Sequence, residues 1–152
     1  MLGKPITTAE MGGTSISQQI LTPKKFLLAG VQAGVIFYGD PAYTSLVMRL
    51  YHDSAGSPGG LIATSKSYSK AEIQSLAHAY KFIGFGFDPF VPMQSSALYH
   101  LVLYAAGYTG DASSHIAYRL AYPDPQYTEG QDLDAAHADN HPFEMTFVGT
   151  DL

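Results

Sequence analysis

The sequence predicts an all-β domain in which two antiparallel sheets pack face to face as a sandwich. Three observations indicate this class. Short runs rich in β-branched and aromatic residues follow one another, most of them alternate apolar and polar side chains, and Gly, Pro, Asp and Ser separate them. A strand with one apolar side needs a second layer to bury that side, and a facing sheet supplies it. The 152 residues suit one domain of ordinary size.

About eight strands account for the apolar runs, in a jelly-roll-like arrangement. They are expected at residues 15–21, 26–38, 46–52, 61–67, 81–87, 98–106, 115–122 and 143–149. In the run 98–106, Leu101 and Leu103 alternate with His100 and Val102, as expected when one side of a strand is buried.

Glycines mark two of these strands. Gly30, inside the run 26–38, predicts a bend or a bulge. In the run 81–87, Gly84 and Gly86 lie on the side opposite Ile83 and Phe85. That side is therefore thin, and it allows another molecule to approach the backbone closely.

Four segments are predicted to lie outside the strands. Residues 69–79 are the one helix-like stretch, a short helix or loop insertion, with Ser69 as N-cap and Glu72 three positions later. Residues 88–93 and 123–140 are expected to be loops. Residues 1–14 are expected to form an extended N-terminal arm, so that the single sandwich domain spans 15–152.

Charge and composition limit the classes of function. The net charge of −5 and the scattered basic residues argue against nucleic-acid binding. No apolar stretch is long enough for a membrane span, and the N-terminus lacks the pattern of a secretory signal. The absence of cysteine excludes disulfides and thiolate ligands. With 14% charged residues, the surface suits contact with proteins or sugars.

Several motifs occur in a recognisable order. They are ISQQI at 16–20, VMRLYHD at 47–53, GSPGGLIATS at 56–65, LYHLVL at 98–103 and YTEG at 127–130. Through them the chain, from about residue 15 to 149, resembles β-sandwich modules of bacteriophage tail-fibre, head-fibre and decoration proteins, which also occur in some bacterial surface proteins. The tryptophan-bearing segment usual in those modules is missing, since the chain contains no Trp.

The resemblance implies a non-enzymatic structural or attachment component of a virion exterior, made in the host cytoplasm and acting through protein–protein contacts. It implies a homo-oligomer whose residues 1–14 contact capsid or tail subunits. The alternative is a carbohydrate-binding module that recognises host surface glycans. No cofactor and no catalytic residues are expected, because the chain has no G-x-S-x-G elbow for a nucleophile.

Individual side chains suggest two kinds of site. His137 and His141, with Asp134, are candidates for a divalent metal site, although a solvated acidic loop is the preferred interpretation. Tyr108 and Tyr127 lie in predicted loops, where a ring with a polar tip can contact a partner or a sugar, and Asp111 is a polar group beside them.

Overall fold

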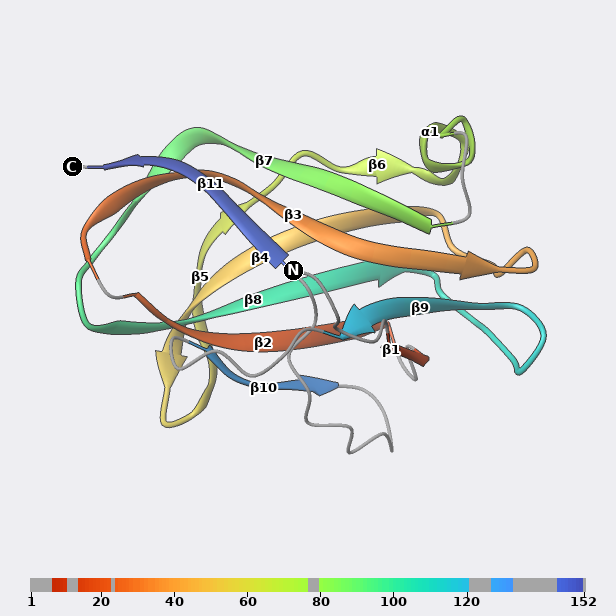
Figure 1. Ribbon diagram of the computed structural model, residues 1–152, viewed down its shortest axis with the longest axis horizontal. Helices are drawn as coiled ribbons and strands as arrows, with labels where there is room; N and C mark the ends of the chain where they lie inside the picture. The colour runs from red at the N-terminus through yellow and green to blue at the C-terminus, as the bar shows by residue number, and fades with distance from the viewer. Residues whose placement is uncertain are drawn as a thin grey trace.

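The computed structural model describes residues 7–10, 14–22, 24–76, 80–120, 127–132 and 145–151, with side chains described for 14–22, 24–76 and 83–117. Within these ranges the chain forms two antiparallel sheets and one short helix. Figure 1 shows β3 and β7 side by side in one sheet, and β2 and β8 side by side in the other. The predicted class, an all-β two-sheet sandwich, is confirmed.

The first sheet, called sheet A, has five strands: β1 (Thr7–Glu10), β3 (Phe26–Tyr38), β7 (Tyr80–Met93), β9 (His115–Leu120) and β11 (Met145–Asp151). The long strand β3 lies at its centre. One edge of β3 pairs with β7. The other edge pairs with β11 and with β9, and β1 pairs in turn with β9.

The second sheet, sheet B, has six strands: β2 (Ser15–Thr22), β4 (Ser45–Ser54), β5 (Ser57–Thr64), β6 (Tyr68–Ser69), β8 (Ala97–Ala106) and β10 (Tyr127–Asp132). Its order is β10-β2-β8-β4-β5, with the two-residue strand β6 also on β4. The chain changes sheet at most of its connections, for example from β2 to β3 and from β7 to β8. Such crossings are a property of jelly rolls.

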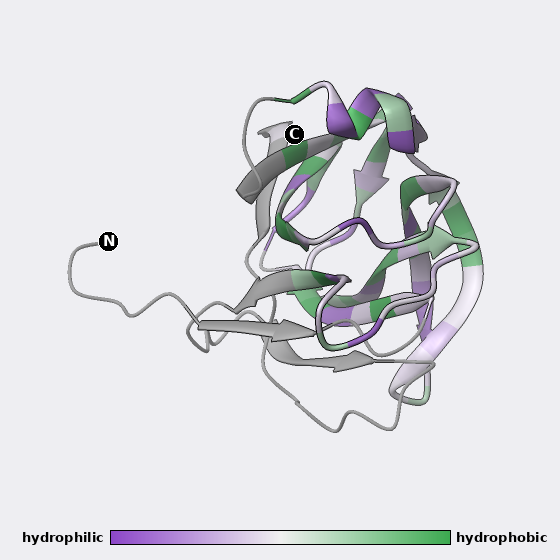
Figure 2. Cartoon of the chain, turned by 90° about the vertical axis from the view of Figure 1, so that its right-hand side faces the viewer, coloured by the Kyte–Doolittle hydropathy of each residue, from purple (hydrophilic) through white to green (hydrophobic). Residues whose placement is uncertain are grey.

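The core lies between the sheets, and alternation along the strands produces it. In Figure 2, hydrophobic and hydrophilic residues follow one another along the strands that carry colour. From sheet A, the fully or almost fully buried side chains include Leu28, Val31, Val35, Ile83, Phe85 and Phe87; from sheet B they include Ile16, Ile20, Leu46, Met48, Leu50, Leu101 and Leu103. Burial of these apolar faces is the main stabilising term, as in any sandwich.

The bulge predicted at Gly30 is confirmed. The pairing of β3 with β7 shifts register between Leu28 and Gly30. A Cβ added at Gly30 would lie 2.7 Å from the carbonyl oxygen of Phe85, so only glycine fits there without movement of the backbone.

Two expected loops contain strands. Residues 88–93 continue β7, because Val91 and Met93 are buried and pair with β3 while Pro92 between them is exposed. Proline is tolerated there since β7 is an edge strand of sheet A. Within the expected loop 123–140, Tyr127–Asp132 forms β10, which pairs with β2. The loop prediction is therefore wrong for 88–93 and for 127–132, and the rest of 123–140 lies outside the described residues.

Two other predicted elements, the helix and the N-terminal arm, also differ from the structure. The N-cap is confirmed, since the Ser69 hydroxyl accepts the N–H of Glu72 at 3.2 Å, but helix α1 is only Lys70–Gln74. In the predicted arm, Thr7–Glu10 is extended and pairs with β9 of the same chain. These four residues are therefore part of sheet A, and the arm does not lie wholly outside the sandwich.

Candidate functional site

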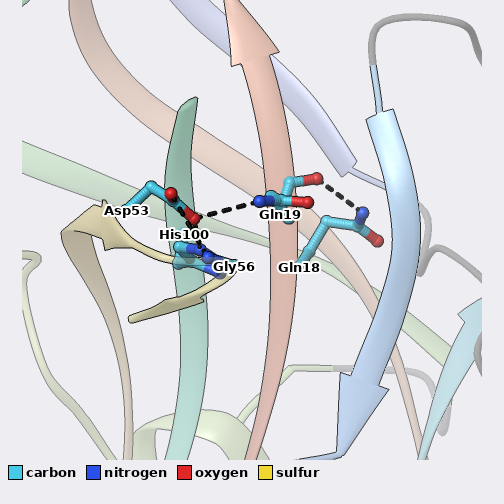
Figure 3. A network of polar contacts seen from close by, with 5 residues as sticks. All are labelled: Gln18, Gln19, Asp53, Gly56 and His100. Atoms are coloured by element: carbon cyan, nitrogen blue, oxygen red, sulfur yellow. Dashed lines mark hydrogen bonds and ion pairs between the residues drawn. The ribbon is translucent and has the colours of Figure 1, made fainter. Parts of the chain in front are cut away.

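A polar network lies on the outer face of sheet B, near the β4–β5 hairpin (Figure 3). His100 of β8 is only 2% exposed, and its Nε2 lies 2.7 Å from Oδ1 of Asp53 on β4. The side-chain amide of Gln19 on β2 donates to the same oxygen at 3.0 Å. The network therefore ties three neighbouring strands together through one carboxylate.

The hairpin turn positions Asp53. Ala55 and Gly56 form a two-residue turn, and both have positive φ, at 52° and 85°. This backbone matches the twist of the strands it joins, and glycine adopts it without strain. The turn directs the N–H of Gly56 toward Oδ2 of Asp53, at 3.4 Å.

These contacts define the charge state of the carboxylate and the tautomer of the ring. The hydrogen bond from His100 lowers the pKa of Asp53 below its ordinary value of 3.8; bonds from Gly56 and Gln19 add to this, and desolvation opposes it. An ionised carboxylate only accepts hydrogen bonds, so Nε2 of His100 carries the proton. Nδ1 of His100 is buried and has no hydrogen-bond partner among the described residues.

The arrangement orients an imidazole but directs its second nitrogen away from solvent. A catalytic base is held by an acid in a similar way, yet it presents its other nitrogen to the reacting group. His100 is 2% exposed, so its Nδ1 is not accessible to a substrate from the surface. The network therefore joins neighbouring strands of sheet B and does not present a basic nitrogen at the surface.

Three exposed leucines lie on the strands around the network and are called here the leucine patch: Leu21, Leu61 and Leu98, at 39%, 55% and 40% exposure. Leu21 and Leu98 are direct partners across β2 and β8, and Leu61 is the partner of Tyr51 across β5 and β4. Paired residues in antiparallel strands lie on the same face. The three leucines therefore share the outer face of sheet B with the polar network.

A second feature is a shallow trough of about 340 Å³ on sheet A, where β3 and β7 meet the segment before β6. We define the trough by its lining: Ala29, Gly30, Val31, Gln32, Lys66, Tyr68, Gly84, Phe85 and Gly86. Gly84 and Gly86 are exposed while Ile83 and Phe85 beside them are buried, so the predicted thin side of this strand is confirmed.

Tyr68 and Lys66 form one wall of the trough. The Tyr68 hydroxyl donates to the carbonyl oxygen of Gly84 at 2.6 Å, and the ring meets Phe85 edge-on at 5.8 Å between centroids. The backbone N–H of Lys66 donates to the carbonyl oxygen of Gly86 at 2.9 Å. The Lys66 ammonium lies 5.0 Å from the Tyr68 ring centroid, a cation–π contact.

The residues predicted to contact a partner or a glycan are Tyr108, Tyr127 and Asp111, and their surroundings differ. Tyr108 is 7% exposed, and its hydroxyl accepts the N–H of Ile116 at 3.1 Å, so the expectation that its ring lies open to a partner is wrong. The reason is the turn at Gly107, with φ of 66°, which folds the loop back onto the core. Tyr127 begins β10, and its side chain lies outside the described residues.

Asp111 is exposed and organises its own turn. Its Oδ1 accepts hydrogen bonds from the Ser113 hydroxyl, the Ser113 N–H and the Ser114 N–H, each at 2.9 Å. These bonds, that of the Ser113 side chain first, lower the pKa of Asp111. A contact between Asp111 and a partner stays a prediction.

The candidate metal ligands His137, His141 and Asp134 lie outside the described residues. In the part of the chain that the structure describes, no group of three or more His, Cys, Asp or Glu side chains could hold a metal ion. Among the same residues, no helix is long and apolar enough to span a membrane.

Sequence reasoning identified Gly84 and Gly86, which form the floor of the trough, but missed the wall formed by Tyr68 and Lys66. Tyr68 and Lys66 precede Gly84 by 16 and 18 positions, and no local pattern links them to β7. The pairing of Asp53 with His100 was also missed, because it depends on the register between β4 and β8.

Comparison with protein-family models, with curated proteins and with solved structures found no match to this chain.

Proposed function

We propose that this chain is a non-enzymatic attachment component of a bacteriophage virion exterior, and that it acts through protein–protein contacts on the outer face of sheet B. The observation that carries the contact surface is the leucine patch, with 39–55% exposure on one sheet face. Contiguous exposed apolar surface marks interaction sites in folded proteins, and we infer that these leucines belong to one such surface. The virion setting is supported by the resemblance of residues 15–149 to phage fibre and decoration modules.

The occupant we propose for the leucine patch is a second copy of the chain. Two identical faces repel each other when they carry unpaired like charges. Here Asp53 accepts hydrogen bonds from His100 and Gln19, and Arg49 lies 4.4 Å from the Tyr104 ring centroid. One of these groups is an anion and the other a cation, so together they add no net charge of one sign to oppose the meeting of two copies.

Contact between residues 1–14 and a capsid or tail subunit is a separate part of the proposal. Thr7–Glu10 pairs with β9 in the described structure, so such a contact has to accommodate this pairing. The reading frames next to the gene test the virion setting: genes for capsid or tail proteins support it, and neighbours of unrelated metabolism contradict it.

Sedimentation equilibrium of the wild type and of Leu98→Glu tests the contact surface. We expect a dimer for the wild type and a dissociation constant raised about 30-fold or more by the glutamate, as for a central interface residue worth about 2 kcal/mol. Leu76→Glu is the matched control, because Leu76 is 47% exposed but lies beyond α1. A monomeric wild type, or equal weakening by both variants, contradicts the proposal.

A further inference from the structure

We propose that the trough on sheet A binds a saccharide that carries a carboxylate group. This site is on the other sheet from the leucine patch, so it does not depend on self-association. The inference goes beyond attachment through protein contacts, and it rests on the floor, the wall and the charge of the trough.

The floor suits a flat ligand. Gly84 and Gly86 expose backbone instead of side chains, and a Cβ placed at Gly84 would meet no atom within 4 Å. A pyranose ring can therefore lie directly on the sheet. The volume of about 340 Å³ is at the small end of ligand sites, which span about 300–1,000 Å³, and is suitable for a mono- or disaccharide.

The wall and rim provide the groups that sugars need. The half-buried Tyr68 ring offers an apolar surface for the C–H groups of a sugar, and its hydroxyl is held in place by Gly84. The exposed Gln32 lines the trough, and its amide both donates and accepts hydrogen bonds, so it matches a hydroxyl group.

Lys66 makes the trough suitable for an acid. Its ammonium lies by the Tyr68 ring, and no carboxylate pairs with it among the described residues. A carboxylate on the ligand would supply that partner. The net charge of −5 does not oppose this at close range, because salt screens charges beyond about 8 Å.

The edge of β7 argues for a saccharide over an extended peptide. A peptide that adds to a sheet needs free backbone groups along the edge strand. In the trough, the carbonyl oxygens of Gly84 and Gly86 already accept hydrogen bonds from Tyr68 and Lys66. A ligand here must therefore bind through the floor, the ring and the side chains on the rim.

NMR titration of the ¹⁵N-labelled chain tests the site. The probes are glucuronate, galacturonate and N-acetylneuraminate as methyl glycosides, with methyl glucoside as the neutral counterpart and an acidic peptide as the rival ligand. We expect saturable shifts of the Gly84 and Gly86 amide signals with at least one acidic sugar. Gly84→Val should weaken that binding at least 10-fold, since its side chain enters open space in the trough.

Two variants distinguish loss of the site from loss of the fold. Gly60→Val is the matched control, because Gly60 is an exposed strand glycine whose added Cβ has its nearest neighbour at 3.9 Å and lies outside the trough. It should bind like the wild type. Lys66→Gln should weaken the acidic sugar about 5- to 10-fold, a loss of about 1 kcal/mol, and leave any neutral sugar unchanged.

The proposal is overturned if none of the acidic sugars shifts Gly84 and Gly86, or if the neutral sugar binds as tightly as the acidic ones. It is also overturned if the acidic peptide alone shifts these signals. Equal affinity of Gly84→Val and Gly60→Val for the acidic sugar would place the ligand elsewhere on the chain.

Discussion

Truncation of Phe85 to alanine tests the packing of sheet A against sheet B. The Phe85 side chain is fully buried on the inner side of β7, opposite Val31 of β3 and edge-on to Tyr68. Removal of a buried ring leaves a cavity that two paired sheets cannot close, which costs about 3–5 kcal/mol. Domains are stable by about 5–15 kcal/mol in total, so the loss is a large share.

The assay is urea unfolding followed by circular dichroism, together with thermal unfolding. At about 2–4 °C per kcal/mol, Phe85→Ala should lower the melting temperature by about 6–20 °C. Phe90→Ala is the control, because Phe90 is on the same strand but 52% exposed. We expect it to cost less than about 1 kcal/mol. Equal losses from the two variants would show that β7 does not bury the side assigned here.

Three further predictions concern polar groups. Because the pKa of Asp53 is lowered on folding, its stabilising contribution is present above pH 3.8 and is lost as pH falls through the lower folded value. Urea midpoints of wild type and Asp53→Asn should therefore converge as the pH falls below about 3.8, and a constant gap would contradict this. Tyr108→Phe leaves the buried N–H of Ile116 without its acceptor and should lower the unfolding free energy by about 1–3 kcal/mol, with an unchanged urea midpoint as the opposing result. Ser65→Ala removes the hydroxyl that accepts the N–H of Met48 on β4 at 2.9 Å, and it should also lower the unfolding free energy by about 1–3 kcal/mol. Ser67 is exposed, so Ser67→Ala should leave the urea midpoint unchanged in the same assay.

Local patterns in the sequence were sufficient for the fold class and for several details. The period-two spacing of Leu101 and Leu103 agrees with their place in the core on the inner face of β8. The three-residue spacing of Ser69 and Glu72 correctly assigned the N-cap of α1. In each case the information lies within a few residues of chain, where periodicity and capping act.

Features that depend on the position of a strand in the sheet could not be read in this way. Proline at 89 and 92 indicated a loop, but an edge strand accepts proline because its outer N–H groups need no partner strand. Thr7–Glu10 has no apolar alternation and joins sheet A through backbone pairing with β9. The turn residues around Tyr108 indicated an exposed loop, yet the ring folds back into the core.

The trough and the leucine patch also contain parts that a local pattern predicts and parts that it does not. Gly84 and Gly86 could be recognised as a thin side of one strand from their alternation with Ile83 and Phe85. The wall of the trough could not, because Lys66 and Tyr68 are distant in sequence from the glycines that they contact, and the leucine patch could not, because its members come from separate strands. Register across several strands, and not any motif, places the leucines on one face of sheet B.

Spin labelling tests most directly the claim that sheet B provides the contact surface. The chain has no cysteine, so Leu61→Cys and Phe90→Cys each accept a single label, on sheet B and on sheet A. If two copies meet through the leucine patch, double electron–electron resonance should give a short, narrow distance between the copies for the label at 61 and a longer one at 90. No distance between copies at either position, or a shorter one at 90, would contradict a contact through sheet B.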